Sequence, residues 1–152
     1  MEFLEIEAMN LINRFNKICK DYDILAVYIF GSMSKEGIAI LNGKKPKKID
    51  SLADIDLGIV FFKKQLNPNK RIKVYSGLYL ELSDIFSPFT LDLVFLQETG
   101  IIIQFEAING ILAYCQDDNR RLDYEENVIK FYQDWKPDYD LYTREVLEAI
   151  SG

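Results

Sequence analysis

The chain has 152 residues, 49% of them hydrophobic and 13% aromatic, which is about one domain's worth of sequence with enough apolar material for a core. Its formal net charge of −6 at pH 7 argues against general nucleic-acid binding, because phosphate contacts need a basic surface. It has no histidine and only two cysteines, Cys19 and Cys115, which excludes histidine catalysis, histidine-ligated metals, zinc clusters and a disulfide framework.

A helix, a strand and a polar loop are predicted in the first third of the chain. Apolar residues recur at steps of three and four over Phe3–Lys20, the period of an amphipathic helix. The continuous apolar run Ile24–Phe30 predicts a central strand that ends at Gly31-Ser32, and a candidate helix start follows near Met33. The sequence then becomes polar, and we expect an exposed, lysine-rich loop insertion over about residues 36–52.

The middle of the chain predicts two more strands and a helix between them. The run Asp54–Phe62 predicts a second strand whose first residues carry two carboxylates. Asn67 followed by Pro68 is typical of a helix N-cap and first helical position, and apolar residues follow at helical spacing. The segment TLDLVFL, Thr90–Leu96, predicts the third strand.

The last third predicts a fourth strand and further helices. A short helical segment ends at Asn109-Gly110 and leads into the strand Ile111–Gln116. An apolar stripe at helical spacing is then expected to face the core: Tyr124, Val128, Phe131 and Trp135. Pro137 is expected to interrupt this helix, leaving Leu141–Ile150 as a last short one.

Three tyrosines of this stretch are candidates for a partner surface. Tyr132, Tyr139 and Tyr142 cannot all be buried with satisfied hydroxyls.

The first ten residues, MEFLEIEAMN, are acidic where a secretory signal is basic, and no apolar run approaches the roughly 20 residues of a membrane span. We therefore expect a soluble, cytoplasmic protein with a single domain over residues 1–152.

The residues that carry chemistry lie at strand ends. Asp54 and Asp56 share one face of their strand, and Asp92 lies among apolar neighbours where an unpaired carboxylate is costly to bury. Taken singly, the Asp-x-Asp pair fits a hydrated strand end, Asp92 fits a strand residue facing water or a lysine, and Gly31-Ser32 fits an ordinary turn.

One arrangement explains these residues together. Adjacent strands would bring the three carboxylates to a common point, and Gly31-Ser32 at the end of the next strand would hold phosphates. Carboxylate oxygens are ligands that Mg²⁺ prefers, and substrate phosphates complete its coordination. These are the parts of a two-metal phosphoryl or nucleotidyl transfer site.

A strand ending in Gly-Ser, a strand opening with Asp-x-Asp and a later strand with a single Asp resemble the DNA polymerase beta superfamily of nucleotidyltransferases. The chain most resembles its minimal nucleotidyltransferase (MNT) branch, the antitoxin partners of HEPN-domain toxins, including the segment QFEAINGILAYCQDD. Two features depart from the family pattern. Residues 33–53 make the spacing from Ser32 to Asp54 about twice the usual one, and Lys35 stands where an arginine is common.

The resemblance implies an α+β fold with a small mixed sheet of about four strands flanked by helices. It also implies ATP as substrate and two Mg²⁺ ions held by Asp54, Asp56 and Asp92. Asp92 would lie nearest the attacking hydroxyl and orient it or accept its proton. Gly31, Ser32 and Lys35 would contact the nucleotide.

The function that the resemblance implies is transfer of AMP from ATP to a tyrosine of a HEPN ribonuclease toxin, by which the antitoxin disables the toxin. A chain of this length has no room for the additional helical domain that shapes the acceptor pocket of larger antibiotic-modifying relatives. Two alternatives stay open. The chain could modify a small molecule such as an antibiotic, or it could neutralise its toxin by occlusion alone, with the three aspartates vestigial.

Overall fold

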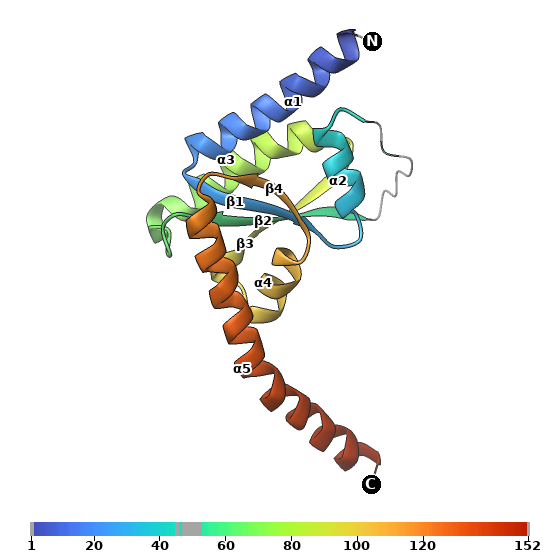
Figure 1. The fold of residues 1–152 in the computed structure, drawn as a ribbon, viewed down its shortest axis with the longest axis vertical. Coiled ribbons are helices and arrows are strands. Elements are labelled where there is room, and N and C mark those ends of the chain that lie inside the picture. The colour runs from blue at the N-terminus through green and yellow to red at the C-terminus, as the bar shows by residue number, and fades with distance from the viewer. Residues whose placement is uncertain (1, 45, 47–52, 152) are drawn as a thin grey trace.

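The computed structural model describes residues 2–44, 46 and 53–151 (Figure 1). Its strands are β1 (Ile24–Phe30), β2 (Asp54–Phe61), β3 (Thr90–Phe95) and β4 (Ile111–Cys115). Its helices are α1 (Glu2–Asp21), α2 (Ser34–Leu41), α3 (Pro68–Phe86), α4 (Ile101–Ile108) and α5 (Asp118–Ser151), and a short 3-10 helix, η1 (Leu96–Glu98), follows β3.

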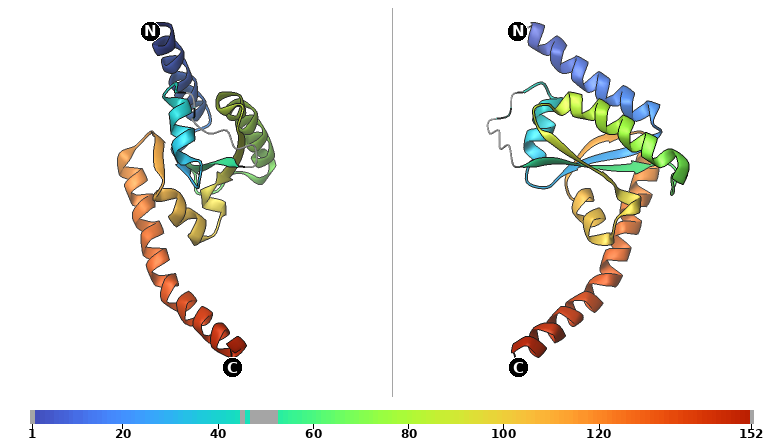
Figure 2. Two further views of the ribbon diagram at one scale, coloured as in Figure 1. Left: turned by 90° about the vertical axis from the view of Figure 1, so that its right-hand side faces the viewer. Right: turned by 180° about the vertical axis from the view of Figure 1, so that it is seen from behind.

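The strands form one mixed sheet in the order β3-β2-β1-β4. β1 is antiparallel to both β2 and β4, whereas β2 and β3 are parallel. Helices α1, α2 and α3 cover one face of the sheet, and α4 with the first half of α5 covers the other (Figures 1 and 2). The expected α+β fold with a four-stranded mixed sheet and flanking helices is therefore confirmed.

Alternation along β2 divides its side chains between two cores. Ile55, Leu57 and Ile59 are fully buried in the core beneath α1 and α3, while Val60 packs in the second core with Ala107 of α4. Successive strand side chains point to opposite faces, so the aspartates at positions 54 and 56 share the α4 face with Val60. The acidic pair thus lies where the second core ends.

Most of the predicted elements are confirmed to within a residue or two. All seven residues of β1 are buried, as expected of a continuous apolar run in a central strand. Asn67 caps α3, because its side-chain oxygen accepts a hydrogen bond from the backbone N–H of Asn69 at 3.0 Å, and Pro68 is the first helical residue. Local signals therefore determine where these elements begin and end.

The expectation of a loop from residue 36 onward is wrong for its first residues. Residues 34–41 form α2, in which Ile40 and Leu41 are buried in the core. Gly37 allows this helix to pack closely, because a Cβ there would lie 2.9 Å from Ile29 Cγ2. Residues 45 and 47–52, with three of the expected loop lysines, lie outside the described residues.

The expectation that Pro137 interrupts the helix and leaves Leu141–Ile150 as a separate one is also wrong. Pro137 lies inside α5, which continues to Ser151 and bends along its length (Figure 1). Proline removes one backbone hydrogen bond and bends a helix, and here the turns on both sides continue. Although long, neither α5 nor any other helix within the described residues is apolar enough to cross a bilayer.

The stripe on α5 that was expected to be core is only partly buried. Val128 is buried, but Phe131 is 68% exposed, so the core assignment is wrong for that residue. Tyr132 is half-buried and stacks on Phe105 of α4 with a centroid distance of 3.7 Å. Tyr142 is exposed, because α5 extends past the end of α4 (Figure 2).

Replacing Gly37 with alanine is expected to lower the free energy of unfolding by about 1–3 kcal/mol, because the new methyl group overpacks the junction of α2 with Ile29 and Ile55. Gly100→Ala is the comparison without overpacking, since a Cβ at that position meets nothing within 4 Å; because Gly100 is the N-cap of α4, the variant should lose only about 0.5 kcal/mol, the cost of a less favourable cap. Urea denaturation followed by circular dichroism measures both. Equal stability of the two variants would contradict the close packing of α2.

Candidate active site

The register of the sheet brings the three predicted aspartates together. Asp56 on β2 is directly opposite Asp92 on the parallel strand β3, and Asp54 is opposite Thr90. Neighbouring strands lie about 4.8 Å apart, and side chains opposite each other share a face. Asp54 and Asp92 are exposed and Asp56 is half-buried, so the cluster opens to solvent at one edge of the sheet.

Asp92 is exposed rather than buried. An aspartate between apolar residues was expected to carry a burial cost, but only its neighbours Leu91 and Leu93 are buried. They face the α3 side, while Asp92 faces the opposite side with Asp56. The significance of Asp92 comes from its position beside Asp56 rather than from burial.

Gly31 forms the third side of the cluster. Phe30, the last residue of β1, is opposite Asp56 on the other side of β2, and Gly31 follows it with φ +78°. A Cβ at Gly31 would overlap Asp56 Oδ2 and lie 3.2 Å from its Cγ. The absence of a side chain therefore lets the backbone of the Gly-Ser turn lie directly against a carboxylate.

Ser32 and Lys35 follow Gly31 at the end of β1. Both are exposed, Ser32 in the turn and Lys35 in the first turn of α2. Met33, rather than a serine, occupies the N-cap of α2 and makes no side-chain cap, which leaves the first backbone N–H groups of the helix without intrahelical partners. Among the ion pairs of the described residues, none joins Lys35 to an aspartate of the cluster.

Burial and like charges together determine the electrostatics of the cluster. Burial raises the pKa of Asp56 to about 6 from an ordinary value of 3.8, and the charge and hydrogen bond of Asp92 and the charge of Asp54 add to the rise. Like charges held together disfavour ionisation unless a cation neutralises them. The carboxylates thus store repulsion that a bound metal would relieve.

The donor set fits Mg²⁺ bound together with a phosphate-bearing substrate. All the oxygens come from carboxylates, which are hard ligands. Within the described part of the chain, no three acidic or cysteine side chains already converge to hold a metal ion by themselves. This agrees with the usual binding of Mg²⁺ by one or two carboxylates, with waters and substrate phosphates as the other ligands.

Glu106 is a member of this cluster that the sequence did not reveal. It is exposed on α4, and its charge also raises the pKa of Asp56. Gly110 positions this helix, because a Cβ there would lie 2.6 Å from the carbonyl oxygen of Ile29 and 2.9 Å from Phe30 Cβ. Glu106 comes near Asp56 because the α4–β4 turn lies against β1, and no sequence pattern predicts this tertiary contact.

The raised pKa of Asp56 predicts that Asp56→Asn stabilises the protein at pH 7. A carboxyl whose folded pKa is raised favours folding below pH 3.8, and this contribution is lost as the pH rises through about 6. Because Asp56 is partly solvated, screening reduces the expected gain to about 1 kcal/mol. Metal-free unfolding in urea at several pH values measures it, and a gain that persisted at pH 4 would contradict this origin.

Comparison with known proteins agrees with this geometry. The model of the family "Polymerase beta, Nucleotidyltransferase" matches residues 13–119. The matched segment runs from within α1 to the start of α5 and contains the Gly-Ser turn and all three aspartates. The fold and this match define a nucleotidyltransferase domain, and the chain belongs to the polymerase beta nucleotidyltransferase family.

Solved structures of toxin–antitoxin complexes have a similar fold. A chain of a toxin–antitoxin crystallised with AMP-PNP is 17% identical, with a TM-score of 0.62 over 90% of this chain and 98% of that one. A chain of the tri-AMPylated Shewanella oneidensis HEPN toxin in complex with MNT antitoxin is 17% identical, with a TM-score of 0.59 over 92% and 98%. A chain of MntA–HepT is 15% identical, with a TM-score of 0.59 over 91% and 98%. At these identities the likeness establishes the fold, and no curated protein matches the chain.

Proposed function

We propose that the chain transfers AMP from ATP to a tyrosine of a HEPN ribonuclease toxin and acts as the antitoxin of that partner. The observation that supports the proposal is the position of Asp56 opposite Asp92 on the neighbouring strand, with Asp54 two residues away on the same face and the backbone of Gly31 against Asp56. Structures of similar fold include a toxin–antitoxin with AMP-PNP and a tri-AMPylated HEPN toxin with its MNT antitoxin. They support ATP as the nucleotide and a HEPN protein as the acceptor.

The residues of the candidate site would have separate roles in binding the metal ions and the phosphates. Asp54 and Asp56 would hold the Mg²⁺ that binds the triphosphate, and both would hold the second ion together with Asp92. When bound, the ions would neutralise charge on the attacking and leaving oxygens. The turn at Gly31-Ser32 would place backbone N–H groups against the phosphates, and Lys35 would add a positive charge.

The exposed Asp92 would orient the acceptor. It would accept a hydrogen bond from the tyrosine hydroxyl, and the hydroxyl oxygen would attack the α-phosphorus in line. The new bond joins this oxygen to the α-phosphorus, the bond to the bridging oxygen breaks, and pyrophosphate leaves with the electron pair. The hydroxyl proton passes to Asp92 or to water.

An open site favours a macromolecular acceptor over a small one. Asp54 and Asp92 are exposed at the sheet edge, and β3 is an edge strand. Small-molecule sites are concave and bury most of their ligand. A protein acceptor would instead bring its own surface to cover the aspartates.

Labelled ATP tests the reaction type. The chain is incubated with Mg²⁺ and a purified HEPN toxin, using ATP labelled either at the α- or at the γ-phosphate. We expect the partner to acquire label from α-labelled ATP only. Label from γ-labelled ATP would indicate phosphorylation, and neutralisation of the toxin with no label from either would indicate occlusion; both results would contradict the proposal.

A further inference from the structure

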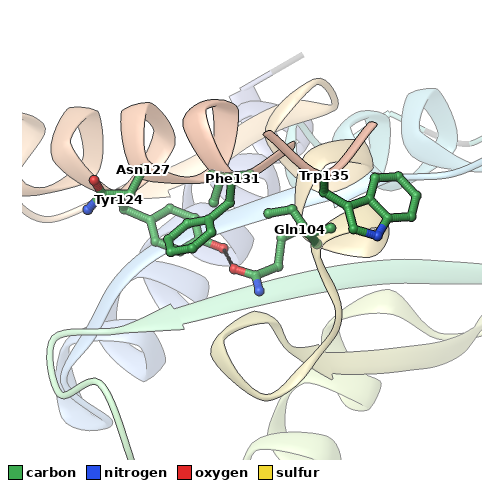
Figure 3. Close-up of a pocket in the computed structure, with 7 residues that line it drawn as sticks. Gln104, Tyr124, Asn127, Phe131 and Trp135 are labelled. Carbon is green, nitrogen blue, oxygen red and sulfur yellow. Dashed lines mark hydrogen bonds between the residues drawn. The ribbon is translucent and has the colours of Figure 1, made fainter. Parts of the chain in front are cut away.

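Helix α5 carries one apolar stripe along its whole length, but the body of the protein covers only the first part of it. In the first part, Val128 is buried, and the hydroxyl of Tyr124 donates a hydrogen bond to Gln104 Oε1 of α4 at 2.7 Å (Figure 3). Tyr132 stacks on Phe105 of α4. This half of the helix is therefore held by ordinary packing against α4.

The stripe continues beyond α4 at the same helical spacing. We call its continuation the distal stripe, and it consists of Tyr139, Tyr142, Val146 and Ile150. These positions advance by three or four residues and so lie on the same side of the helix as Val128. Their exposed fractions are 45%, 65%, 37% and 77%, and the ribbon shows this half of α5 extending away from the sheet (Figures 1 and 2).

An apolar groove joins the covered and exposed parts of the stripe. The groove has a volume of about 400 Å³ and is lined by residues of α4 and α5 that include Ile101, Phe131 and Trp135 (Figure 3). Trp135 stacks on Tyr139 at a centroid distance of 4.5 Å, so the groove leads directly into the distal stripe. Together they form a continuous apolar surface, which on a protein usually marks an interaction site.

The charges beside the distal stripe indicate what covers it. Asp134, Asp138, Glu145 and Glu148 are all exposed and recur at helical spacing along one flank of the stripe. In an antiparallel pair of two copies, the same flanks would face each other and bring like charges together, which opposes association. A different protein with an apolar ridge edged by lysine or arginine is complementary to this surface.

We propose that the groove and distal stripe of α5 are the docking surface for the protein acceptor, separate from the aspartates that modify it. The partner would contribute an apolar ridge with a basic border, as expected of a protein that itself binds RNA phosphates. This inference rests on the proposed function for the identity of the partner. Docking on α5 would hold the acceptor on the same molecule as the aspartates and raise its effective concentration at them.

Paired aspartate substitutions test the docking surface. Tyr142→Asp with Val146→Asp places charge on the distal stripe, whereas Leu141→Asp with Leu147→Asp places the same charge at the adjacent exposed positions outside it. Affinity for the purified HEPN protein is measured by calorimetry, with helix content checked by circular dichroism. We expect the first pair to weaken binding by at least about 30-fold and the second by less than about threefold.

The outcomes separate this inference from the proposed function. Wild-type affinity of the Tyr142→Asp, Val146→Asp variant would overturn the docking surface even if AMP transfer continues. Binding through the stripe without AMP transfer would support the docking surface and overturn the proposed reaction. No binding of the HEPN protein by the wild-type chain would overturn both. A homodimer that this variant dissociates in ultracentrifugation would assign the stripe to a second copy and overturn the choice of partner.

Discussion

Replacing Asp54 and Asp56 together with asparagine is expected to lower the rate of AMP transfer by at least about a thousandfold. Asparagine keeps the size of each side chain but removes the negative charge that binds Mg²⁺. The substitutions also remove the burial of a charge and the repulsion that together raise the pKa of Asp56, so the variant should fold at least as stably as the wild type. Activity and stability would then change in opposite directions, which is the signature of residues retained for function.

The rate is measured as pyrophosphate release in the presence of the HEPN partner. Asp21→Asn with Asp84→Asn is the matched control, because these aspartates are exposed and form surface ion pairs with Lys17 and Arg14 on the helices that cover the opposite face of the sheet. Surface pairs contribute about 1 kcal/mol or less, so this control should keep wild-type activity. A double variant at positions 54 and 56 that kept a tenth of wild-type activity would contradict the assignment.

Replacing Gly31 with alanine is expected to lower the rate of AMP transfer by about a hundredfold, because a displaced carboxylate or phosphate loop misplaces the reacting groups. The new methyl group would overlap the carboxylate of Asp56, and the backbone at φ +78° is strained for alanine. The free energy of unfolding should also fall by about 1–2 kcal/mol.

The Gly43→Ala variant distinguishes the effect of backbone strain on stability from an effect on the reaction rate. Gly43 has φ +75°, nearly the same as Gly31, but it follows the C-terminus of α2 at the opposite end of that helix from the site. Its alanine variant should lose similar stability and keep full activity. Equal activity of the two variants, measured at a temperature where both are folded, would show that the contact between Gly31 and Asp56 has no role in the reaction.

The sequence predicted the bounds of the strands better than the ends of the helices. Strand β1 is a continuous apolar run and β2 is continuously buried from Leu57 to Phe61, and this burial in the centre of the sheet leaves little alternative structure for them. Pro137 does not end its helix, because the helical turns on both sides of it continue. The rule that proline breaks a helix considers only the proline itself and not the stability of these turns. Residues 34–41 were missed as a full helix because Gly37 and the short length weaken the local signal, while packing on Ile29 and Ile55 stabilises it.

The candidate site was predictable in its residues but not in its contacts. Asp54, Asp56 and Asp92 were identified from their positions in strands, and the register of β2 with β3 places them together. The close approach of the Gly31 backbone to Asp56 depends on the pairing of Phe30 with Asp56, which no local pattern specifies. Glu106 joins the cluster through the fold of α4, so only the tertiary structure reveals it.

The intact mass of the HEPN partner tests the central claim most directly. The partner is incubated with ATP, Mg²⁺ and either the wild-type chain or the Asp54→Asn, Asp56→Asn variant. With the wild type we predict a mass increase equal to a whole number of AMP groups, located on tyrosine by fragmentation, and with the variant no increase. A partner that is bound and neutralised by the wild-type chain at unchanged mass would contradict the account.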